Sequence, residues 1–292
     1  MVVIDDHHNG WRHLILPVAH MNDLVLNSVL AVSAFHLSES AAGYLPIHPR
    51  LLFMQAIGGL QNRRNLDKCD LQTKQFVILA IVVLLAAVMV NGCSDFPIVF
   101  RMLQSALDAV GGERSLSDGE VAEFLRREIH KMRAYGAPFI GQDAGRRALE
   151  SQAQQSFDCL QFYFRLYPDH SHTFHAIASL RQQAYRIYLH RTATETHITI
   201  PVESIEDFKS SLETFSEGSL GEHTLVWAVF IAASESRVST HRRFFEQFLE
   251  RQYRRNRFLN LSKALQLLKR IWKRSSSENW TALLPEPRVL IM

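Results

Sequence analysis

The chain has 292 residues and a mass of 33.5 kDa, with 47% hydrophobic and 21% charged residues. A chain of this length buries about 70–75% of its unfolded surface, and this composition excludes disorder as its main state. The net charge of +3 is unevenly distributed, because residues 241–274 contain eleven Lys or Arg and only two Glu. That segment therefore carries +9, and the rest of the chain carries −6.

The cysteines and the N-terminal residues point to an intracellular setting. Cys69, Cys93 and Cys159 are too widely spaced for a zinc knuckle, and their odd number argues against a disulfide framework. The first eight residues lack the basic and apolar regions of a secretory signal.

The first half of the chain predicts a series of helices. One begins at Asn22 or Asp23 and continues to about Ser40, and the next begins near Pro49. The most apolar helix follows, with fifteen unbroken apolar residues at 76–90. A helix of that length covers about 22 Å, less than the ~30 Å of a bilayer core. We therefore expect a buried core helix, capped by Asp70 and ended by Gly92, and no membrane span.

The second half also predicts helices, after a break at residues 136–141. Before the break, one helix is expected from Asp95 to Gly111 and another from a capping box at residues 117–120 to about Ala134. The break, with Gly136, Pro138 and Gly141, suggests a single regulatory domain over 1–292 with two helical halves meeting near 136–145. Further helices are expected at residues 144–166, 172–192, 202–217, 222–236, 240–256 and 259–274, with an extended linker at 193–200. The predicted fold is all-α, with about ten or more packed helices.

Two clusters contain side chains of the types that bind metals and are therefore candidate metal sites. Asp5-Asp6-His7-His8 resembles the first magnesium motif of all-α terpene cyclases, but the second motif fails because Ile98 stands where a carboxylate is required. Residues 169–175 contain three histidines, yet Asp169 or Ser171 at this place is typical of a helix start. We predict no metal ligand in either cluster.

Searches for a catalytic motif are also negative. There is no Gly-x-Ser-x-Gly elbow, no phosphate-binding Gly-Lys-Ser/Thr loop and no His-Glu-x-x-His helix. Cys93 follows Gly92 at a helix end, which is not the setting that activates a thiol. We therefore expect a protein that is not an enzyme, with no catalytic and no cofactor-binding residue.

The strongest candidate for an interaction surface is the basic stretch from residue 241 to 258. Its aromatic residues recur at helical spacing, as in the pairs 244/248 and 245/249, which predicts a buried stripe with the arginines on the solvent side. Three interpretations remain open: a solvated helix face, a surface for an acidic partner or an import signal, and direct DNA contact. The residues of this basic surface are Arg242, Arg243, Arg251, Arg254, Arg255 and Arg257.

Several segments, in order, resemble one known family. They include an apolar block around Trp227, a helix ending at Trp272 and a closing segment with Trp280. The remaining segments are 9–17, 24–37, 184–192 and 288–292. Together they resemble the fungal-specific transcription factor domain of fungal zinc-cluster transcription factors, and most closely the acriflavine sensitivity control protein type.

The resemblance implies a nuclear regulator of RNA polymerase II transcription, controlling a metabolic or secondary-metabolite gene set. Members of the family bind DNA through an N-terminal six-cysteine zinc cluster, and such a cluster is not among these residues. We therefore expect no zinc or other cofactor and no direct DNA binding by this chain alone. The expected partners are the transcription machinery or a full-length zinc-cluster relative, and a homodimer is a further option.

The sequence is also compatible with two alternative functions. The first is a small-molecule-sensing helical domain, because helices can enclose an apolar ligand and Phe157, Phe162, Phe164 and Phe174 could line its pocket. The second is an all-α biosynthetic enzyme, which the missing catalytic motifs disfavour.

Overall fold

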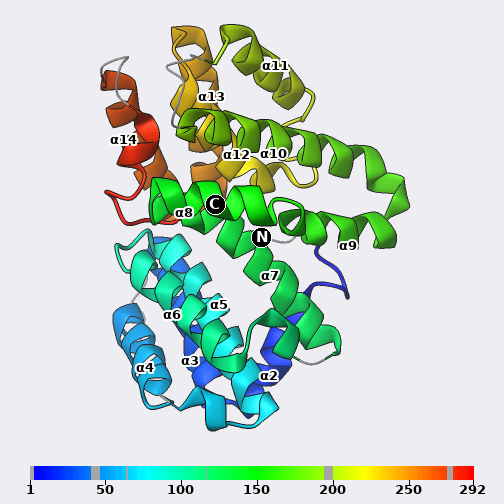
Figure 1. Ribbon diagram of the computed structural model, residues 1–292, viewed down its shortest axis with the longest axis vertical. Coiled ribbons are helices and arrows are strands. Elements are labelled where there is room, and N and C mark those ends of the chain that lie inside the picture. Colours follow the sequence, from blue (N-terminus) through cyan, green and yellow to red (C-terminus); the bar gives the residue numbers. More distant parts are fainter. Residues whose placement is uncertain (1–2, 41–46, 64, 117, 194–199, 275–278) are drawn as a thin grey trace. The chain divides into compact units, whose positions relative to one another are not determined.

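The computed structural model describes residues 3–40, 47–63, 65–116, 118–193, 200–274 and 279–292, and their regular elements are all helices (Figure 1). These residues form two compact units. We call Asp5–Ile129 the N-terminal unit, and Met1–Ile4 together with His130–Met292 the C-terminal unit. Helix α7, Glu120–Gly136, contributes residues to both. The predicted all-α fold is confirmed.

The break in the sequence pattern lies inside the C-terminal unit. Residues 137–139 form a short 3-10 turn directly after α7, and α8 begins at Gln142. A boundary between two halves at 136–145 stays a prediction.

The N-terminal unit is built around its most apolar helix, α5. All side chains from Val77 to Val90 are buried, and α3, α4 and α6 contact this helix. α5 is the one helix in the described chain that is long and apolar enough to cross a membrane, and 78% of its apolar window is buried inside the protein. The helices of this unit are α1 Gly10–His13, α2 Ile15–Met21, α3 Asp23–Ser40, α4 Pro49–Gln61, α5 Leu71–Asn91, α6 Phe96–Val110 and the first part of α7.

The two ends of α5 are fixed by residues that the sequence identifies. The Asp70 side chain accepts a hydrogen bond of 2.7 Å from the Thr73 N–H, one of the amides that a helix start leaves without a partner. At the other end Gly92 has φ +58°, a left-handed conformation that glycine adopts without steric cost. The predicted cap and stop are confirmed.

The C-terminal unit is organised around α10. This helix contacts α8, α9, α11 and α12, and α12 in turn contacts α13 and α14. The elements are α8 Gln142–Gln152, α9 Asp158–Leu166, α10 Ser171–Thr192, α11 Val202–Glu213, α12 Val226–Glu235, α13 Ser239–Asn256, α14 Leu259–Lys273 and the 3-10 turns Glu222–Leu225 and Trp280–Leu283.

Three tryptophans tie these helices together through their indole N–H groups. Trp227 donates to the backbone oxygen of Tyr135 at 3.2 Å, and their rings stack with centroids 5.1 Å apart. Trp272 donates to the backbone oxygen of Ala233 at 2.8 Å. The third, Trp280, is fully buried and belongs to the Glu235 site described below.

The structure departs from the sequence-based helices in one clear place. The single helix expected at 144–166 is two helices, α8 and α9, separated by a short 3-10 turn. Ser156 lies in this turn, where its hydroxyl donates to the backbone oxygen of Ala153 at 2.6 Å and also pairs with the Tyr185 hydroxyl at 2.7 Å. A serine hydroxyl that takes a backbone carbonyl competes with the helix, so this tertiary contact favours the break.

Smaller differences concern helix ends. The helix expected at 202–217 ends at Glu213, and the one expected at 222–236 begins with a 3-10 turn before α12. Two predicted features, the capping box at 117–120 and the linker at 193–200, include Ser117 and residues 194–199, which lie outside the described residues.

Candidate interaction surface

Helix α13 has one buried and one exposed face. Phe245, Phe248 and Leu249 are at most 2% exposed, and the helix contacts α11, α12 and α14. The ring of Phe208 in α11 meets Phe245 edge-on, with centroids 5.9 Å apart. Residues three and four positions apart share one side of a helix, so the predicted buried stripe is confirmed.

Two of the six predicted surface arginines are half-buried and already engaged. The Nε of Arg242 donates to the backbone oxygen of Ser236 at 2.9 Å, and its guanidinium lies 5.6 Å from the centre of the Trp272 ring. Arg251 lies 3.8 Å from Glu222 and over the ring of Phe248. Both side chains contribute to packing inside the C-terminal unit, so neither is a free contact for a partner.

The other four arginines are exposed, with different degrees of pairing. Arg255 lies 3.6 Å from the carboxylate of Glu222, and Arg254 lies 3.3 Å from that of Glu250. Arg243 and Arg257 are exposed and have no ion-pair or hydrogen-bond partner for their side chains within the described chain. These two guanidinium groups are therefore open to a partner.

The exposed face of α13 carries both signs of charge. Arg243, Glu250 and Arg254 lie seven and eleven positions apart and so share one side of the helix. Glu246 also belongs to this region, where it pairs with Lys269 of α14 at 3.2 Å. The face is basic overall, but its positive charge is interrupted by two carboxylates.

A buried carboxylate, Glu222, connects the basic helix to the turn before α12. Its side chain is 3% exposed, accepts a hydrogen bond of 2.8 Å from the Gly218 N–H, and faces Arg251 and Arg255. Gly221 precedes it with φ +77°, and a Cβ there would lie 2.5 Å from Ile177. Glycine is therefore required at this position for the turn to present Glu222 to α13.

A second buried carboxylate, Glu235 at the end of α12, holds the C-terminal segment. Its side chain is 1% exposed and accepts two hydrogen bonds from Arg191 of α10, at 2.8 and 2.6 Å. The indole N–H of Trp280 donates to the same carboxylate at 2.8 Å. A paired guanidinium and carboxylate with a third donor satisfies most of the hydrogen-bonding capacity of a buried charge.

The charges near Glu235 do not cancel. Arg237 lies 3.5 Å from this carboxylate, in addition to Arg191. Burial lowers the pKa of the Arg274 guanidinium, Glu235 opposes that shift, and Arg191, Arg237 and Arg242 add to it. Burial also lowers the pKa of Arg242. Three guanidinium groups, those of Arg191, Arg237 and Arg274, therefore act on the Glu235 carboxylate.

The interior of the C-terminal unit also holds a cation to which no carboxylate of the described residues is bonded. Arg181 of α10 is 3% exposed, and its guanidinium donates to the backbone oxygen of Thr224 at 3.4 Å and to the Cys159 sulfur at 3.7 Å. The guanidinium also lies 5.6 Å from the centre of the Tyr135 ring. Burial raises the pKa of the neighbouring Tyr185 to about 12. This core is aromatic and polar.

A surface groove of about 450 Å³ lies between α10 and the start of α11. It is lined by polar side chains together with Ile187 and Ile200. The phenylalanines expected to line a pocket do not line this groove: Phe157 and Phe174 are buried, and Phe164 packs edge-on against Phe174. Phe157 and Phe174 are part of the core, whereas Phe162 and Phe164 are half-buried.

Comparison with known families decides what kind of chain this is. The sequence profile of the fungal specific transcription factor domain matches residues 1–131 and 143–291. The chain belongs to this family. No curated protein and no solved structure matches it. The family resemblance of the tryptophan segments is thereby confirmed, and the fold described above is that of a fungal-specific transcription factor domain.

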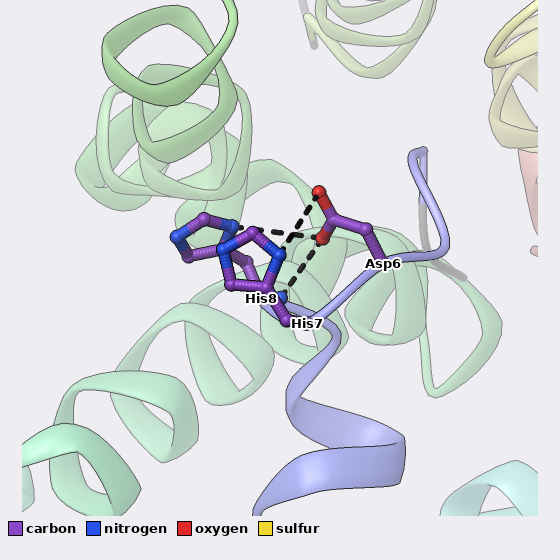
Figure 2. Close-up of side chains that lie close together, drawn as sticks. All are labelled: Asp6, His7 and His8. Carbon is purple, nitrogen blue, oxygen red and sulfur yellow. Dashed lines mark hydrogen bonds and ion pairs between the residues drawn. The ribbon is translucent and has the colours of Figure 1, made fainter.

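In this fungal-specific transcription factor domain, one group of potential metal ligands converges within the described residues. Figure 2 shows Asp6, His7 and His8, whose ligand atoms lie within 4.8 Å of one another. The Asp6 carboxylate accepts the His8 backbone N–H at 2.8 Å, and the imidazole Nδ1 atoms of His8 and His7 lie 3.6 and 4.0 Å from it. The three residues are consecutive in one turn, which explains this arrangement, and we assign no metal to it.

The histidines at 170–175 do not form a comparable group in the described part of the domain. His175 packs against the ring of Phe164, with centroids 4.5 Å apart, and His172 contacts its neighbour Thr173. These side chains belong to the start of α10.

Sequence reasoning located the arginines of the domain but missed their buried acidic partners. Glu222 and Glu235 stand at the two ends of the apolar segment 223–234, and a charged residue beside such a segment is a signal that could have identified them. The pairing with Arg191, 44 positions away, is a product of the fold and has no local signal.

Proposed function

We propose that this chain is a nuclear regulatory domain that modulates RNA polymerase II transcription of a metabolic gene set, without catalytic activity of its own. The observation that carries the proposal is the family match over residues 1–131 and 143–291. The domain acts by binding other proteins. Its partners are the transcription machinery, a full-length zinc-cluster relative or a second copy of itself.

The charge pattern of α13 supports an acidic protein partner over DNA. Phosphate binding favours an uninterrupted set of cations, because each neutralised phosphate releases counterions. Here Glu246 and Glu250 interrupt the exposed face, and Arg242 and Arg251 are engaged within the domain. A surface of alternating charge is instead typical of protein interfaces that select a partner by complementary charges.

The test is a reporter assay with the full chain fused to a heterologous DNA-binding module. We expect the fusion to change transcription, and we expect the triple variant R243E/R254E/R257E to lose most of this effect. A matched control, R101E/R147E/R165E, makes the same charge change at exposed arginines on other helices and should behave like the wild type. A wild-type fusion with no effect on the reporter would refute the regulatory role.

A further inference from the structure

The groove between α10 and α11 has the size of a small-molecule site. Its volume of about 450 Å³ lies within the roughly 300–1,000 Å³ typical of ligand pockets. One wall is a continuous face of α10 from Ser179 to His190, and the other is the beginning of α11 with Ser204 and Asp207.

The two walls of the groove, α10 and α11, carry side chains of opposite charge. Arg186 belongs to α10 and Asp207 to α11, and both line the groove. Within the described chain, neither side chain has an ion-pair or hydrogen-bond partner, whereas the neighbouring Lys209 of α11 pairs with Glu206 and Glu213. The groove thus offers one free cation and one free anion to an occupant.

The floor of the groove is apolar and contains one buried imidazole nitrogen without a partner. Ile187 and Ile200 are 5% and 8% exposed. His190 also lines the groove, and its Nδ1 atom is buried with no hydrogen-bond partner in the described structure. A buried polar atom without a partner costs free energy unless a bound molecule or water satisfies it.

From these features we propose that the groove binds a zwitterionic small molecule with an aliphatic body, either a free α-amino acid or a short peptide. The guanidinium of Arg186 binds the carboxylate, for which its planar pair of donors is suited. Asp207 binds the ammonium group, and the aliphatic side chain lies on Ile187 and Ile200. The His190 Nδ1 forms a hydrogen bond with a polar atom of the ligand, or with a water molecule that the ligand holds in place.

The position of α11 connects this groove to the basic surface. The residue before Asp207 is Glu206, which points to a different side of α11, and its carboxylate hydrogen-bonds to the His241 Nε2 of α13 at 2.5 Å. Phe208 packs against Phe245 of the same helix. A ligand that holds α11 against α10 therefore changes the contact between α11 and α13. This regulatory consequence rests on the proposed function, but ligand binding itself does not.

Binding is tested with the purified full chain by titration calorimetry and by thermal shift, using L-leucine and L-leucyl-L-leucine as probes. A ligand that binds only the folded state raises the melting temperature. N-acetyl-L-leucine lacks the ammonium charge and L-leucine methyl ester lacks the carboxylate, so both should bind roughly tenfold or more weakly. The tighter of the two zwitterions identifies whether the natural ligand is a free amino acid or a peptide.

Two variants test the assigned charges, each with a matched control. R186Q and D207N should each weaken binding of the zwitterion roughly tenfold or more. R165Q and D169N remove the same charges at exposed positions outside the groove and should bind like the wild type. All four positions are exposed, so the melting temperatures without ligand should agree.

The proposal is overturned if neither zwitterion produces heat or a thermal shift at about 10 mM, where even millimolar binding would be visible. It is equally overturned if R186Q and D207N bind as tightly as the wild type. A reporter fusion that is active but indifferent to leucine, together with measured binding, would refute only the regulatory coupling. An inactive fusion with intact binding would refute only the proposed function.

Discussion

The two units of this chain are stabilised by different chemistry. The N-terminal unit buries the aliphatic helix α5, in which every side chain from Val77 to Val90 is apolar and enclosed. The C-terminal unit buries several charged groups, among them Arg181, Glu222 and Glu235, together with aromatic rings, whereas the described N-terminal unit buries one, Glu128. Burial of aliphatic groups requires shape and volume, whereas a buried charge requires specific donors and acceptors. The C-terminal unit should therefore tolerate fewer substitutions of similar size.

The largest expected effect is the removal of the Glu235 carboxylate. Glu235→Ala leaves Arg191, whose side chain is only 13% exposed, without its carboxylate partner, and breaking a buried ion pair in this way costs about 3–5 kcal/mol. Denaturant unfolding followed by tryptophan fluorescence measures it, because three of the four tryptophans, Trp227, Trp272 and Trp280, belong to the C-terminal unit and Trp11 alone to the N-terminal unit.

The exposed Glu203 provides the control, since Glu203→Ala should change the free energy of unfolding by less than about 0.5 kcal/mol. Amide hydrogen exchange should show that Glu235→Ala reduces the protection of backbone amides in residues 130–292 but not in α5. Equal losses of protection in both units would contradict the comparison.

Alkaline pH should destabilise the C-terminal unit specifically. Burial raises the pKa of Tyr185 from 10 to about 12, so the folded state retains the proton that the unfolded state loses. The stabilisation is complete below pH 10 and is lost as the pH rises from 10 through about 12, a total of roughly 2–3 kcal/mol for this group. Burial raises the pKa of Tyr135 in the same direction.

The measurement is the free energy of unfolding between pH 8 and the alkaline limit of folding. Tyr185→Phe should flatten the pH dependence while lowering stability at neutral pH, because the bond to Ser156 is lost. The described N-terminal unit contains no tyrosine, so its exchange protection should fall later. An N-terminal unit that opens first would show that another group controls alkaline unfolding.

A smaller difference in the free energy of unfolding is expected between two conservative substitutions, one in the core of each unit. Trp280→Phe removes the indole donor to Glu235 and should cost about 1–3 kcal/mol, in addition to the smaller ring. Leu84→Met in α5 keeps the volume and breaks no hydrogen bond, so it should cost less than about 1.5 kcal/mol. Unfolding midpoints of the two variants under the same conditions test the order, and a reversed order would contradict it.

The same difference explains what could be predicted from the sequence. The bounds of α5 follow from Asp70, Gly92 and the apolar run between them, because all three signals are local. The buried stripe of α13 follows from the spacing of its phenylalanines. By contrast, the break between α8 and α9 depends on Ser156 meeting Tyr185, 29 residues away. No local pattern contains such a contact.

The candidate surface also has a part that could be predicted from local sequence and a part that could not. The arginines of α13 were recognisable by composition, but which of them are free depends on distant acidic residues. Arg255 is paired because Glu222 lies in the turn before α12. Arg243 has no ion pair within the described chain, because Glu246, three positions along α13, pairs with Lys269 of α14. The groove between α10 and α11 was equally invisible, since Arg186 and Asp207 belong to different helices.

The smallest expected effect concerns acid, and it acts where α11 meets α13. The hydrogen bond from His241, followed by that from Lys209, lowers the pKa of the Glu206 carboxyl below its ordinary 4.5. A carboxyl with a lowered folded pKa stabilises the fold above its unfolded pKa, and this contribution is lost as the pH falls below 4.5. Glu206 is exposed, so solvent screening keeps the effect small, yet its carboxylate is the partner that joins α11 to His241.

Glu206→Gln should therefore reduce the acid dependence of stability without changing the alkaline transition set by Tyr185. If the variant and the wild type lose stability identically between pH 5 and 3, the contact between α11 and α13 does not depend on this carboxylate, and α11 then acts on α13 through the Phe208–Phe245 pair and through Lys209 against the ring of Phe244.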